Sequence, residues 1–349
     1  MNPIKFNQVK DKLRRAPRRW LVTGAGGFIG SNLLETLLDL NQEVVALDNF
    51  STGQRRNWKQ VEQAVGPEKW SKVTLLEEDI CNSEVCTRAC EGVQSVLHQA
   101  ALGSVPRSIG DPLASNHNNV TGYLNVLTAA KDQGVENFVY ASSSSVYGNH
   151  PELPKFEGQV GEPLSPYAVT KKINELYAAV FEKCYEIKPI GLRYFNVFGR
   201  RQDPQGAYAA VMPKWFSALL LDEEVVINGD GETSRDFCYI DNTVQANILA
   251  GTTTSDSAKG TVYNVACGKR TTLNELFHAI RNEIAKVRPE VSKIEPLYKA
   301  FRDGDVKHSL ADITHIRNNL GYEPTDSVAE GLQKAAAWYI GDLQGRAND

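Results

Sequence analysis

The chain has 349 residues, of which 42% are hydrophobic and 23% are charged, as in ordinary globular proteins. Its formal net charge of −4 gives no general attraction to nucleic acid or to an anionic membrane. No run of residues approaches the roughly 18 consecutive apolar positions that a membrane-spanning helix needs. We therefore expect neither nucleic-acid binding nor membrane insertion.

Basic residues are crowded ahead of the first apolar strand, between Lys10 and Arg19. A secretory or transit sequence is not favoured, because no apolar run follows directly and the acidic Asp11 interrupts the basic residues. We interpret residues 1–18 as an N-terminal extension that packs as a helix on the surface of the next domain. Binding of a phosphate or of an acidic partner is the alternative.

The six cysteines show no paired spacing. Cys81, Cys86 and Cys90 lie close together, but none belongs to a CxxC pair and no histidine lies at ligand spacing from them. We therefore expect no metal site. Reduced, mostly buried thiols are typical of a cytoplasmic protein, which is the location that we predict.

The first strong pattern is a strand, a glycine-rich turn, a helix and a second strand. We expect these elements at residues 20–23, 24–30, 31–39 and 43–47. A glycine-rich turn alone is weak evidence of a ligand. Together with the other elements, and with Asp48 directly after the second strand, it is typical of a dinucleotide-binding unit.

Each residue of this unit has a physical task. Gly24 permits the tight turn, Gly27 lets the backbone approach a pyrophosphate, and Gly30 lets the helix pack close to the strand. The N-terminus of the helix then faces the phosphates. Asp48 lies 18 residues after Gly30, where a carboxylate can accept hydrogen bonds from both hydroxyls of the adenosine ribose. Because an acid there repels a 2′-phosphate, we predict NAD rather than NADP.

Strands and helices then alternate along the chain. We expect further strands at residues 73–76, 93–101 and 138–141, and helices at residues 111–132 and 167–185. This alternation predicts an α/β protein with a doubly wound parallel (Rossmann) sheet, whose ligands bind at the carboxyl ends of the strands. Asp79 lies at one such end, where it can cap the adenine pocket. His98 lies at another, and we expect its ring nitrogens to be satisfied within the protein.

After about residue 190 the pattern becomes turn-rich and mixed, which predicts a smaller mixed α/β substrate-binding lobe. We expect the cofactor domain at residues 19–191 with a returning segment at about 237–264, and the lobe at residues 192–236 and 265–349. Arg235 and Arg302 lie in the lobe beside turns, where an arginine can grip a diphosphate with two hydrogen bonds. Surface salt bridges are the alternative for either residue.

The spacing of Tyr167 and Lys171 places phenol and ammonium on one face of the expected helix. A free tyrosine titrates near pH 10, so Tyr167 can act as a base only where positive charge stabilises its anion. Lys171 can supply that charge. A serine from Ser142 to Ser145, at the end of a strand, can relay the proton. The spacing alone usually marks a half-buried aromatic residue and a solvated lysine, but the cofactor pattern upstream favours catalysis.

These residues resemble an extended short-chain dehydrogenase/reductase, and specifically the UDP-hexose 4-epimerase family, from Trp20 to about Trp338. The motifs that carry the resemblance are TGAGGFIG at 23–30, LDNFSTG at 47–53, HQAA at 98–101, NNV at 118–120, SSSSVYG at 142–148, SPYAVTK at 165–171, RYFNVFG at 193–199, SRDF at 234–237 and RDGD at 302–305. The first motifs indicate the superfamily, and the later ones indicate nucleotide-sugar enzymes.

The resemblance implies a set of catalytic residues, namely Ser143, Tyr167 and Lys171. Tyr167 would take the proton of the sugar 4-hydroxyl through Ser143, and Lys171 would hold the cofactor ribose and lower the pKa of Tyr167. Ser142 or Ser144 could share the role of Ser143, since four serines follow one another. NAD would remain bound between turnovers, because the net redox change is zero.

The resemblance also implies which residues bind the two ligands. The residues expected to bind NAD are Gly24, Gly27, Phe28, Ile29, Gly30, Asp48, Asn49, Phe50, Ser51, Thr52, Gly53, Asp79, Ile80, Gln99, Ala100, Ala101, Asn119, Tyr167, Lys171 and Tyr194. The residues expected to bind the UDP-sugar are Ser104, Ser142, Ser143, Ser144, Asn196, Arg235, Arg302, Asp305 and Ser309.

Substrate choice is expected to depend on Ser309. Epimerases restricted to plain hexoses resemble one another in having a tyrosine there, whereas serine leaves room for an N-acetyl group. Residues 103–108 and the N-terminal extension also resemble those of bacterial UDP-N-acetylglucosamine 4-epimerases. We therefore predict interconversion of UDP-N-acetylglucosamine and UDP-N-acetylgalactosamine, with the uronic acid forms as a further candidate substrate class.

Three other functions stay open. A UDP-glucose/UDP-galactose 4-epimerase is one, and a 4,6-dehydratase is another, although it would need a carboxylate beside the catalytic hydroxyl where this chain has serines. A dinucleotide-binding protein without catalysis is the third, although the tyrosine, lysine and serine are all present. Apolar residues on several faces of helices 115–132 and 167–185 suggest a homodimer.

Overall fold

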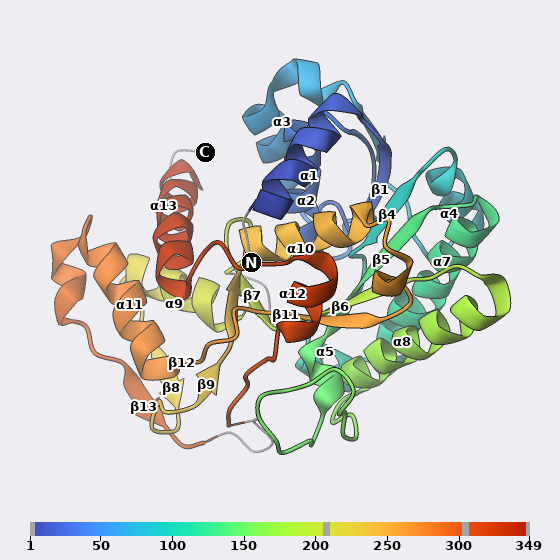
Figure 1. Ribbon diagram of the computed structural model, residues 1–349. Helices are drawn as coiled ribbons and strands as arrows, with labels where there is room; N and C mark the ends of the chain where they lie inside the picture. The colour runs from blue at the N-terminus through green and yellow to red at the C-terminus, as the bar shows by residue number, and fades with distance from the viewer. Residues whose placement is uncertain (1–3, 205–209, 302–306, 347–349) are drawn as a thin grey trace.

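The computed structural model describes residues 4–204, 210–301 and 307–346, so the candidate residues Arg302 and Asp305 lie outside the described part of the chain. Its centre is a seven-stranded parallel sheet (Figure 1). The strands are, in order across the sheet, β11 (Val262–Val265), β6 (Ile190–Tyr194), β5 (Asn137–Ser143), β4 (Ser95–His98), β1 (Arg19–Thr23), β2 (Glu43–Leu47) and β3 (Val73–Leu76). The predicted doubly wound α/β sheet is confirmed.

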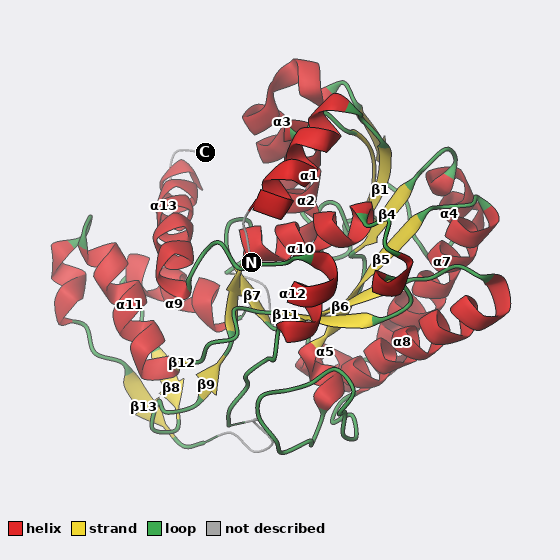
Figure 2. Cartoon of the chain, in the orientation of Figure 1, coloured by secondary structure: helices red, strands yellow, loops and turns green. Residues whose placement is uncertain are grey.

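Helices cover both faces of this sheet, which explains why its central strands are apolar on both sides. One layer contains α2 (Phe28–Asp39), α3 (Arg55–Trp70) and α10 (Ile240–Thr252); the opposite layer contains α4 (Ser83–Cys90), α7 (Tyr123–Asp132) and α8 (Pro166–Tyr185) (Figure 2). The predicted N-terminal helix is α1 (Ile4–Arg15), which contacts α10. In the described part of the chain, no helix is both long enough and apolar enough to span a membrane.

The helix expected at residues 111–132 is interrupted. It begins as α6 (Pro112–Asn116), directly after the short α5 (Val105–Gly110), and a π-helical turn at residues 117–122 separates it from α7. The side-chain amide of Asn174 donates to the backbone oxygen of Asn119 in this turn, at 2.8 Å. A side-chain donor from α8 therefore holds this wider turn. The spacing of apolar residues in the sequence cannot indicate such a contact.

The smaller lobe, which the sequence predicts to bind the substrate, is assembled from short two-stranded pairs and helices. Its strands are β7 (Asn196–Phe198) with β10 (Phe237–Tyr239), β8 (Val226–Asn228) with β13 (Leu297–Lys299), and β9 (Ser234–Arg235) with β12 (Thr271–Thr272). Its helices are α9 (Val211–Leu220), α11 (Leu273–Ala285) and α13 (Val328–Arg346), whereas α12 (Thr314–Leu320) contacts β11 of the large sheet and α10. The boundary expected at residue 191 falls inside β6, which stays in the large sheet as far as Tyr194.

A buried ion pair joins α8 to the sheet. The carboxylate of Glu175 accepts two hydrogen bonds from Arg193 on β6, at 2.8 and 2.9 Å, and one from the hydroxyl of Ser142 on β5, at 2.7 Å. The side chains of Arg193 and Glu175 are only 2% and 7% exposed. Nζ of Lys172 lies further from the carboxylate of Glu175, at 3.7 Å. Since α8 also carries Tyr167, this pair sets the position of the helix against the strand that carries the serines.

Replacing Arg193 therefore has a large expected cost. In Arg193→Met the carboxylate of Glu175 stays buried without its main partner, and the free energy of unfolding should fall by about 3–5 kcal/mol. The measurement is chemical denaturation followed by circular dichroism. The matched control is Arg317→Met, because Arg317 pairs with Glu323 at the surface; its expected change is within about 1 kcal/mol. Equal losses in the two variants would contradict this role of the pair.

Candidate active site

A cleft opens at the carboxyl ends of β1, β2 and β4. It is lined by Gly24, Gly27, Leu47, Asp48, Asn49, Ser51, Thr52, Gly53, Glu78, Ile80, Gln99, Ala100, Ala101, Leu102 and Asn118. Eleven of the residues that the sequence suggested for NAD are in this set, namely Gly24, Gly27, Asp48, Asn49, Ser51, Thr52, Gly53, Ile80, Gln99, Ala100 and Ala101. This is the edge at which a doubly wound sheet binds its ligand.

The glycine-rich turn fits a pyrophosphate. Gly24 has a φ of 68°, and a Cβ there would lie 2.7 Å from the backbone nitrogen of Ala100. A Cβ on Gly30 would overlap the backbone of Gly24. Gly27 is the N-cap of α2 and has no side chain to accept a hydrogen bond from the first backbone N–H groups of this helix. Those groups need an acceptor, and a phosphate at the helix N-terminus is a suitable one.

Asp48 closes the other end of the cleft. Its carboxylate accepts hydrogen bonds from the backbone nitrogens of Gly26, at 2.8 Å, and Phe50, at 2.7 Å. Burial raises the pKa of Asp48, and these backbone hydrogen bonds offset part of the rise. The remaining lone pairs of the carboxylate fit ribose hydroxyls. The described residues therefore fit NAD, with the phosphates at α2 and the adenosine ribose at Asp48.

Two candidate cofactor residues have structural partners instead of lining the cleft. The side-chain amide of Asn119 is buried and bonds both the nitrogen and the oxygen of Leu102, at 2.7 and 3.1 Å, so the neighbouring Asn118 faces the cleft. The hydroxyl of Tyr194 lies 3.0 Å from Oε1 of Gln99 and 2.8 Å from Nδ2 of Asn247. Tyr194 therefore contacts Gln99, which lines the cleft.

The other candidates outside the lining set have different surroundings. Phe28, Ile29 and Gly30 form the first turn of α2. Phe50 packs edge-on against Trp58, with ring centres 4.7 Å apart. Asp79 accepts hydrogen bonds from Asn49, at 2.8 Å, and from the backbone of Cys81, at 2.7 Å. The buried ring of His98 bonds the hydroxyl of Thr23 at 2.9 Å, as the sequence predicted for its ring nitrogens.

Tyr167 and Lys171 lie together in the first turns of α8. The helix begins where Ser165 accepts a hydrogen bond from the backbone nitrogen of Ala168, at 3.1 Å. The side chain of Ser143, at the carboxyl end of β5, is near enough to the phenol of Tyr167 to lower its pKa by hydrogen bonding. Nζ of Lys171 lies 5.9 Å from the centre of the Tyr167 ring. The structure thus brings together the three residues that the sequence suggested for catalysis.

The pKa of Tyr167 differs from the sequence-based expectation. Burial raises it above the ordinary value, and the hydrogen bond with Ser143 offsets only part of that rise. Burial also lowers the pKa of Lys171 to about 8. Nζ of Lys171 donates to the backbone oxygen of Ala141, at 2.8 Å, and is not among the groups that lower the pKa of Tyr167. Ionisation of Tyr167 therefore requires additional positive charge, such as that of a bound nicotinamide ring.

The structure also separates the roles of the consecutive serines. Ser142 is buried and donates to Glu175, so its proton is committed to the ion pair. Ser143 accepts hydrogen bonds from the backbone nitrogen and the hydroxyl of Ser145, at 3.1 and 2.9 Å. Those bonds leave the hydroxyl hydrogen of Ser143 available for relay. Ser144 begins a short 3₁₀ turn and is half-buried.

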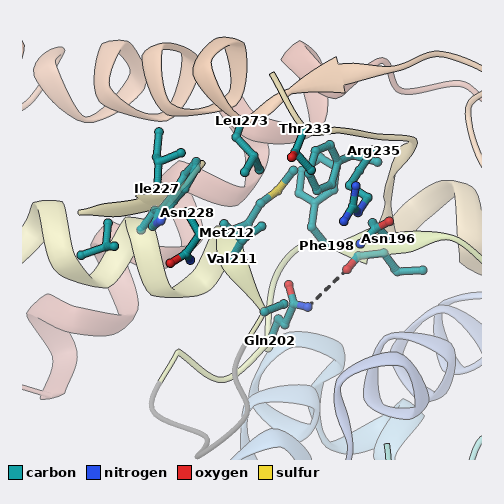
Figure 3. A pocket seen from close by; sticks show the side chains of 15 residues that line it. Asn196, Phe198, Gln202, Val211, Met212, Ile227, Asn228, Thr233, Arg235 and Leu273 are labelled. Atoms are coloured by element: carbon teal, nitrogen blue, oxygen red, sulfur yellow. Dashed lines mark hydrogen bonds between the residues drawn. The ribbon is translucent and has the colours of Figure 1, made fainter. Parts of the chain in front are cut away.

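A second pocket lies in the smaller lobe, among β7, β8, β10 and α9 (Figure 3). It is lined by Asn196, Val197, Phe198, Gln202, Ala210, Val211, Met212, Trp215, Val226, Ile227, Asn228, Thr233, Arg235, Phe237 and Leu273. It contains two of the residues predicted for the substrate, Asn196 and Arg235. The guanidinium of Arg235 donates to the backbone oxygens of Ser234, at 3.0 Å, and Lys307, at 3.2 Å.

Sequence reasoning missed most of this pocket. Its apolar walls come from segments far apart in the chain, and only Asn196 and Arg235 among its residues were predicted to bind the substrate. Of the other substrate candidates, Ser309 donates from its backbone nitrogen to the backbone oxygen of Ser234, at 3.0 Å, which places it beside the strand that carries Arg235. Ser104 is the N-cap of α5, with a φ of 97°.

Comparison with known proteins identifies the family. Residues 20–266 match the model of the NAD dependent epimerase/dehydratase family. A UDP-glucose 4-epimerase of Mycolicibacterium smegmatis is 35% identical, covering 92% of this chain and 98% of the relative. A UDP-glucuronate 4-epimerase of Thermodesulfobacterium geofontis is 32% identical, covering 91% of this chain and 95% of the relative.

A solved structure agrees with this result. The UDP-N-acetylglucosamine 4-epimerase of Methanobrevibacter ruminantium, in complex with UDP-N-acetylmuramic acid, superposes with a TM-score of 0.85 at 37% identity, covering 93% of this chain and 99% of that one. The chain therefore belongs to the NAD dependent epimerase/dehydratase family, and NAD is its cofactor.

Proposed function

We propose that the protein is an NAD-dependent 4-epimerase of UDP-N-acetylhexosamines, which interconverts UDP-N-acetylglucosamine and UDP-N-acetylgalactosamine through a transient 4-keto sugar. The observation that carries the proposal is that Ser143 and Lys171 both lie near the phenol of Tyr167, at the end of β5. That strand neighbours β4, whose end supplies Gln99, Ala100 and Ala101 to the cofactor cleft.

The residues can move the proton that epimerisation requires. Tyr167, as phenolate, removes the proton of the sugar 4-hydroxyl with Ser143 as the bridge, and returns it after the sugar has turned over in the site. Lys171 holds the ribose next to the nicotinamide and contributes positive charge. Bound NAD supplies reversible hydride acceptance at carbon 4, so the reaction has no net redox change.

The second pocket suits the uridine diphosphate. Its walls are mostly apolar side chains and aromatic rings, and Arg235 and Asn196 supply polar groups at its rim. Such a lining is typical of pockets that bind a flat base and fix it with few hydrogen bonds. Relatives that act on UDP-sugars support this assignment.

The preference for acetylated sugars rests on Ser309. Serine is small, and its backbone bond to Ser234 holds it beside the strand of Arg235. The similarity to a UDP-N-acetylglucosamine 4-epimerase also favours this substrate. The UDP-glucose and UDP-glucuronate relatives favour the plain or uronic forms, which are the alternative substrates. A 4,6-dehydratase is less favoured, since hydroxyls rather than a carboxylate follow Ser143.

The purified protein, without added cofactor, is expected to convert UDP-N-acetylglucosamine to UDP-N-acetylgalactosamine faster than UDP-glucose to UDP-galactose. Tyr167→Phe should lower kcat by about 10²–10⁴-fold, because the general base is lost. Product separation by chromatography provides the measurement. Tyr185→Phe, at the exposed end of the same helix, is the matched control and should retain activity. An active Tyr167→Phe variant would contradict the assigned base.

Substitution of Ser309 tests the sugar preference. Ser309→Tyr should lower kcat/KM for UDP-N-acetylglucosamine by about 10-fold or more through steric exclusion, while turnover of UDP-galactose is spared. Ser309→Ala keeps the space open and is the control. The two rates are compared for each variant by the same chromatographic assay. Equal loss on both substrates would refute the specificity role.

We also propose that the protein is a homodimer. Apolar side chains are exposed on α5, α6 and α8, including Ile109 (64%), Leu113 (82%), Leu176 (56%) and Val180 (50%). We place the interface on α5, α6 and α8 rather than on the expected helices 115–132 and 167–185. The reason is that α7 is largely covered, whereas α5 and α6 pack against α8. Two copies could bury these side chains in a symmetric interface.

Sedimentation measurements test this association. The unchanged protein is expected to have the mass of two chains. Leu176→Glu should give the mass of one chain, because a charge would have to be buried in the interface. Val287→Glu introduces the same charge at an exposed site away from these helices and should remain a dimer. A dimeric Leu176→Glu variant would place the interface elsewhere.

A further inference from the structure

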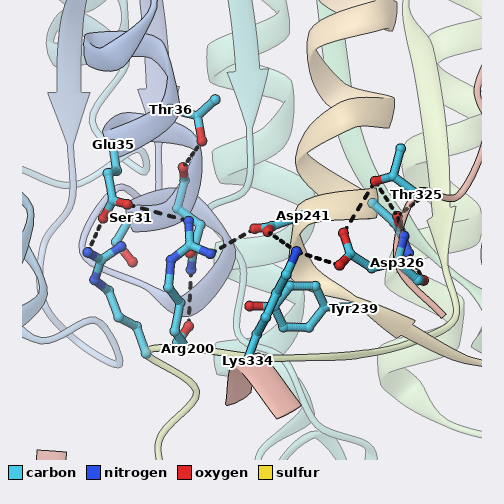
Figure 4. A network of polar contacts seen from close by, with 12 residues as sticks. Ser31, Glu35, Thr36, Arg200, Tyr239, Asp241, Thr325, Asp326 and Lys334 are labelled. Atoms are coloured by element: carbon cyan, nitrogen blue, oxygen red, sulfur yellow. Dashed lines mark hydrogen bonds and ion pairs between the residues drawn. The ribbon is translucent and has the colours of Figure 1, made fainter. Parts of the chain in front are cut away.

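A row of alternating charges joins the cofactor domain to the substrate lobe (Figure 4). In spatial order it contains Arg201, Glu35, Arg200, Asp241, Lys334 and Asp326. Arg200 lies at its centre, 3.4 Å from Glu35 and 2.7 Å from Asp241. Arg201 forms an ion pair with the same carboxylate of Glu35. One carboxylate therefore holds two neighbouring arginines.

The first three residues of this row lie between the two candidate ligand sites. Glu35 is on α2, whose N-terminal turn is the predicted pyrophosphate site. Arg200 and Arg201 lie in the turn that follows β7, and the next residue, Gln202, lines the substrate-lobe pocket. A second link runs parallel to the first, since Nδ2 of Asn32 donates to the backbone oxygens of Phe28 and Arg200, at 2.8 and 3.1 Å.

The turn itself has an unfavourable backbone. Arg201 has a φ of 67°, in the left-handed region that residues other than glycine seldom occupy. Such a conformation persists only where the surroundings impose it. The ion pair with Glu35 and the hydroxyl of Tyr339, which donates to the backbone oxygen of Gln202 at 3.1 Å, are two such restraints. The side-chain amide of Gln202 donates to the backbone oxygen of Val197, at 3.2 Å, and both residues line the pocket (Figure 3).

A role in surface solvation alone does not account for this arrangement. The side chains of Arg201 and Glu35 are only 4% and 16% exposed. Burial of a carboxylate in that environment costs desolvation free energy. Apolar side chains at the same positions would stabilise the fold equally well if only stability were required. Here its partners are Arg200 and Arg201, which directly precede Gln202 in the lining of the second pocket.

We propose that Glu35 is a positioning residue that couples the cofactor helix to the wall of the pocket for uridine diphosphate, and so keeps the sugar at transfer distance from the nicotinamide. This inference rests on the proposed function of the pocket. In this role Glu35 contacts neither ligand. Its effect is transmitted through Arg200 and Arg201 to the position of Gln202.

The test uses Glu35→Gln, which keeps the shape of the side chain and removes its charge. We expect UDP to bind about 10-fold more weakly by titration calorimetry, since restraint of the pocket wall is lost. After incubation with the UDP-sugar, the variant should also retain more reduced cofactor than the unchanged protein, because a misplaced keto sugar accepts the hydride back less efficiently. Cofactor released from the denatured protein is measured by its absorbance.

Two further variants make the outcome decisive. Glu35→Asp retains the charge and should recover part of the UDP affinity. Arg201→Gly removes the ion pair but eases the left-handed backbone, so it should fold even if Glu35→Gln does not, and it should also bind UDP more weakly. Glu77→Gln, from an exposed pair with Arg55, is the matched control and should bind UDP like the unchanged protein.

The results separate this inference from the proposed function. If the unchanged protein binds UDP and turns over UDP-sugars, but Glu35→Gln and Arg201→Gly bind UDP equally well and accumulate no reduced cofactor, the coupling is wrong and the cluster is structural. If the unchanged protein neither binds UDP nor converts UDP-sugars, the proposed function and the inference fail together.

Discussion

The position of α8 on the sheet is the constraint on which the candidate chemistry depends. The buried carboxylate of Glu175 holds this helix to two strands at once, through Ser142 on β5 and Arg193 on β6. Tyr167 and Lys171 precede it on the same helix, and Ser143 is the next residue after Ser142 on the strand. A charge pair of this kind gains little net stability over apolar packing. It does, however, fix the register between the helix and the strand, on which the distance from Ser143 to Tyr167 depends.

Burial at this site has opposite effects on its two ionisable groups. It raises the pKa of Tyr167, which disfavours the phenolate, and it lowers the pKa of Lys171 to about 8, which disfavours the ammonium. Both shifts have the same cause, because a charge loses hydration when it is buried. The two residues therefore do not supply the positive charge that a phenolate of Tyr167 needs at neutral pH until a cation binds nearby. This dependence links proton removal to a bound cofactor and explains why an epimerase would gain from retaining NAD.

The sequence predicted the parts of the fold that follow from local patterns. Alternating apolar strands and helices predicted the sheet, and Gly24, Gly27 and Asp48 lie in the cofactor cleft because backbone geometry at a strand end dictates those residue types. Asn119 shows where this reasoning fails. A π-helical turn rotates its side chain onto the backbone of Leu102 and leaves Asn118 facing the cleft. That rotation depends on contacts from α8, which no spacing in the sequence encodes.

The substrate pocket was hardest to predict because no single segment builds it. Its walls come from β7, the turn after it, α9, β8 and the start of α11, and most of these residues are apolar ones that any core could contain. They form a pocket because the surrounding structure separates these segments and fixes their orientation. Arg201, which has a left-handed backbone and an ion pair with Glu35 of α2, directly precedes Gln202 in the pocket lining, so this wall is linked to a helix of the other domain. The ion pairs between α2 and the turn after β7 thus connect the two candidate ligand sites, and this connection is the basis of the role proposed for Glu35.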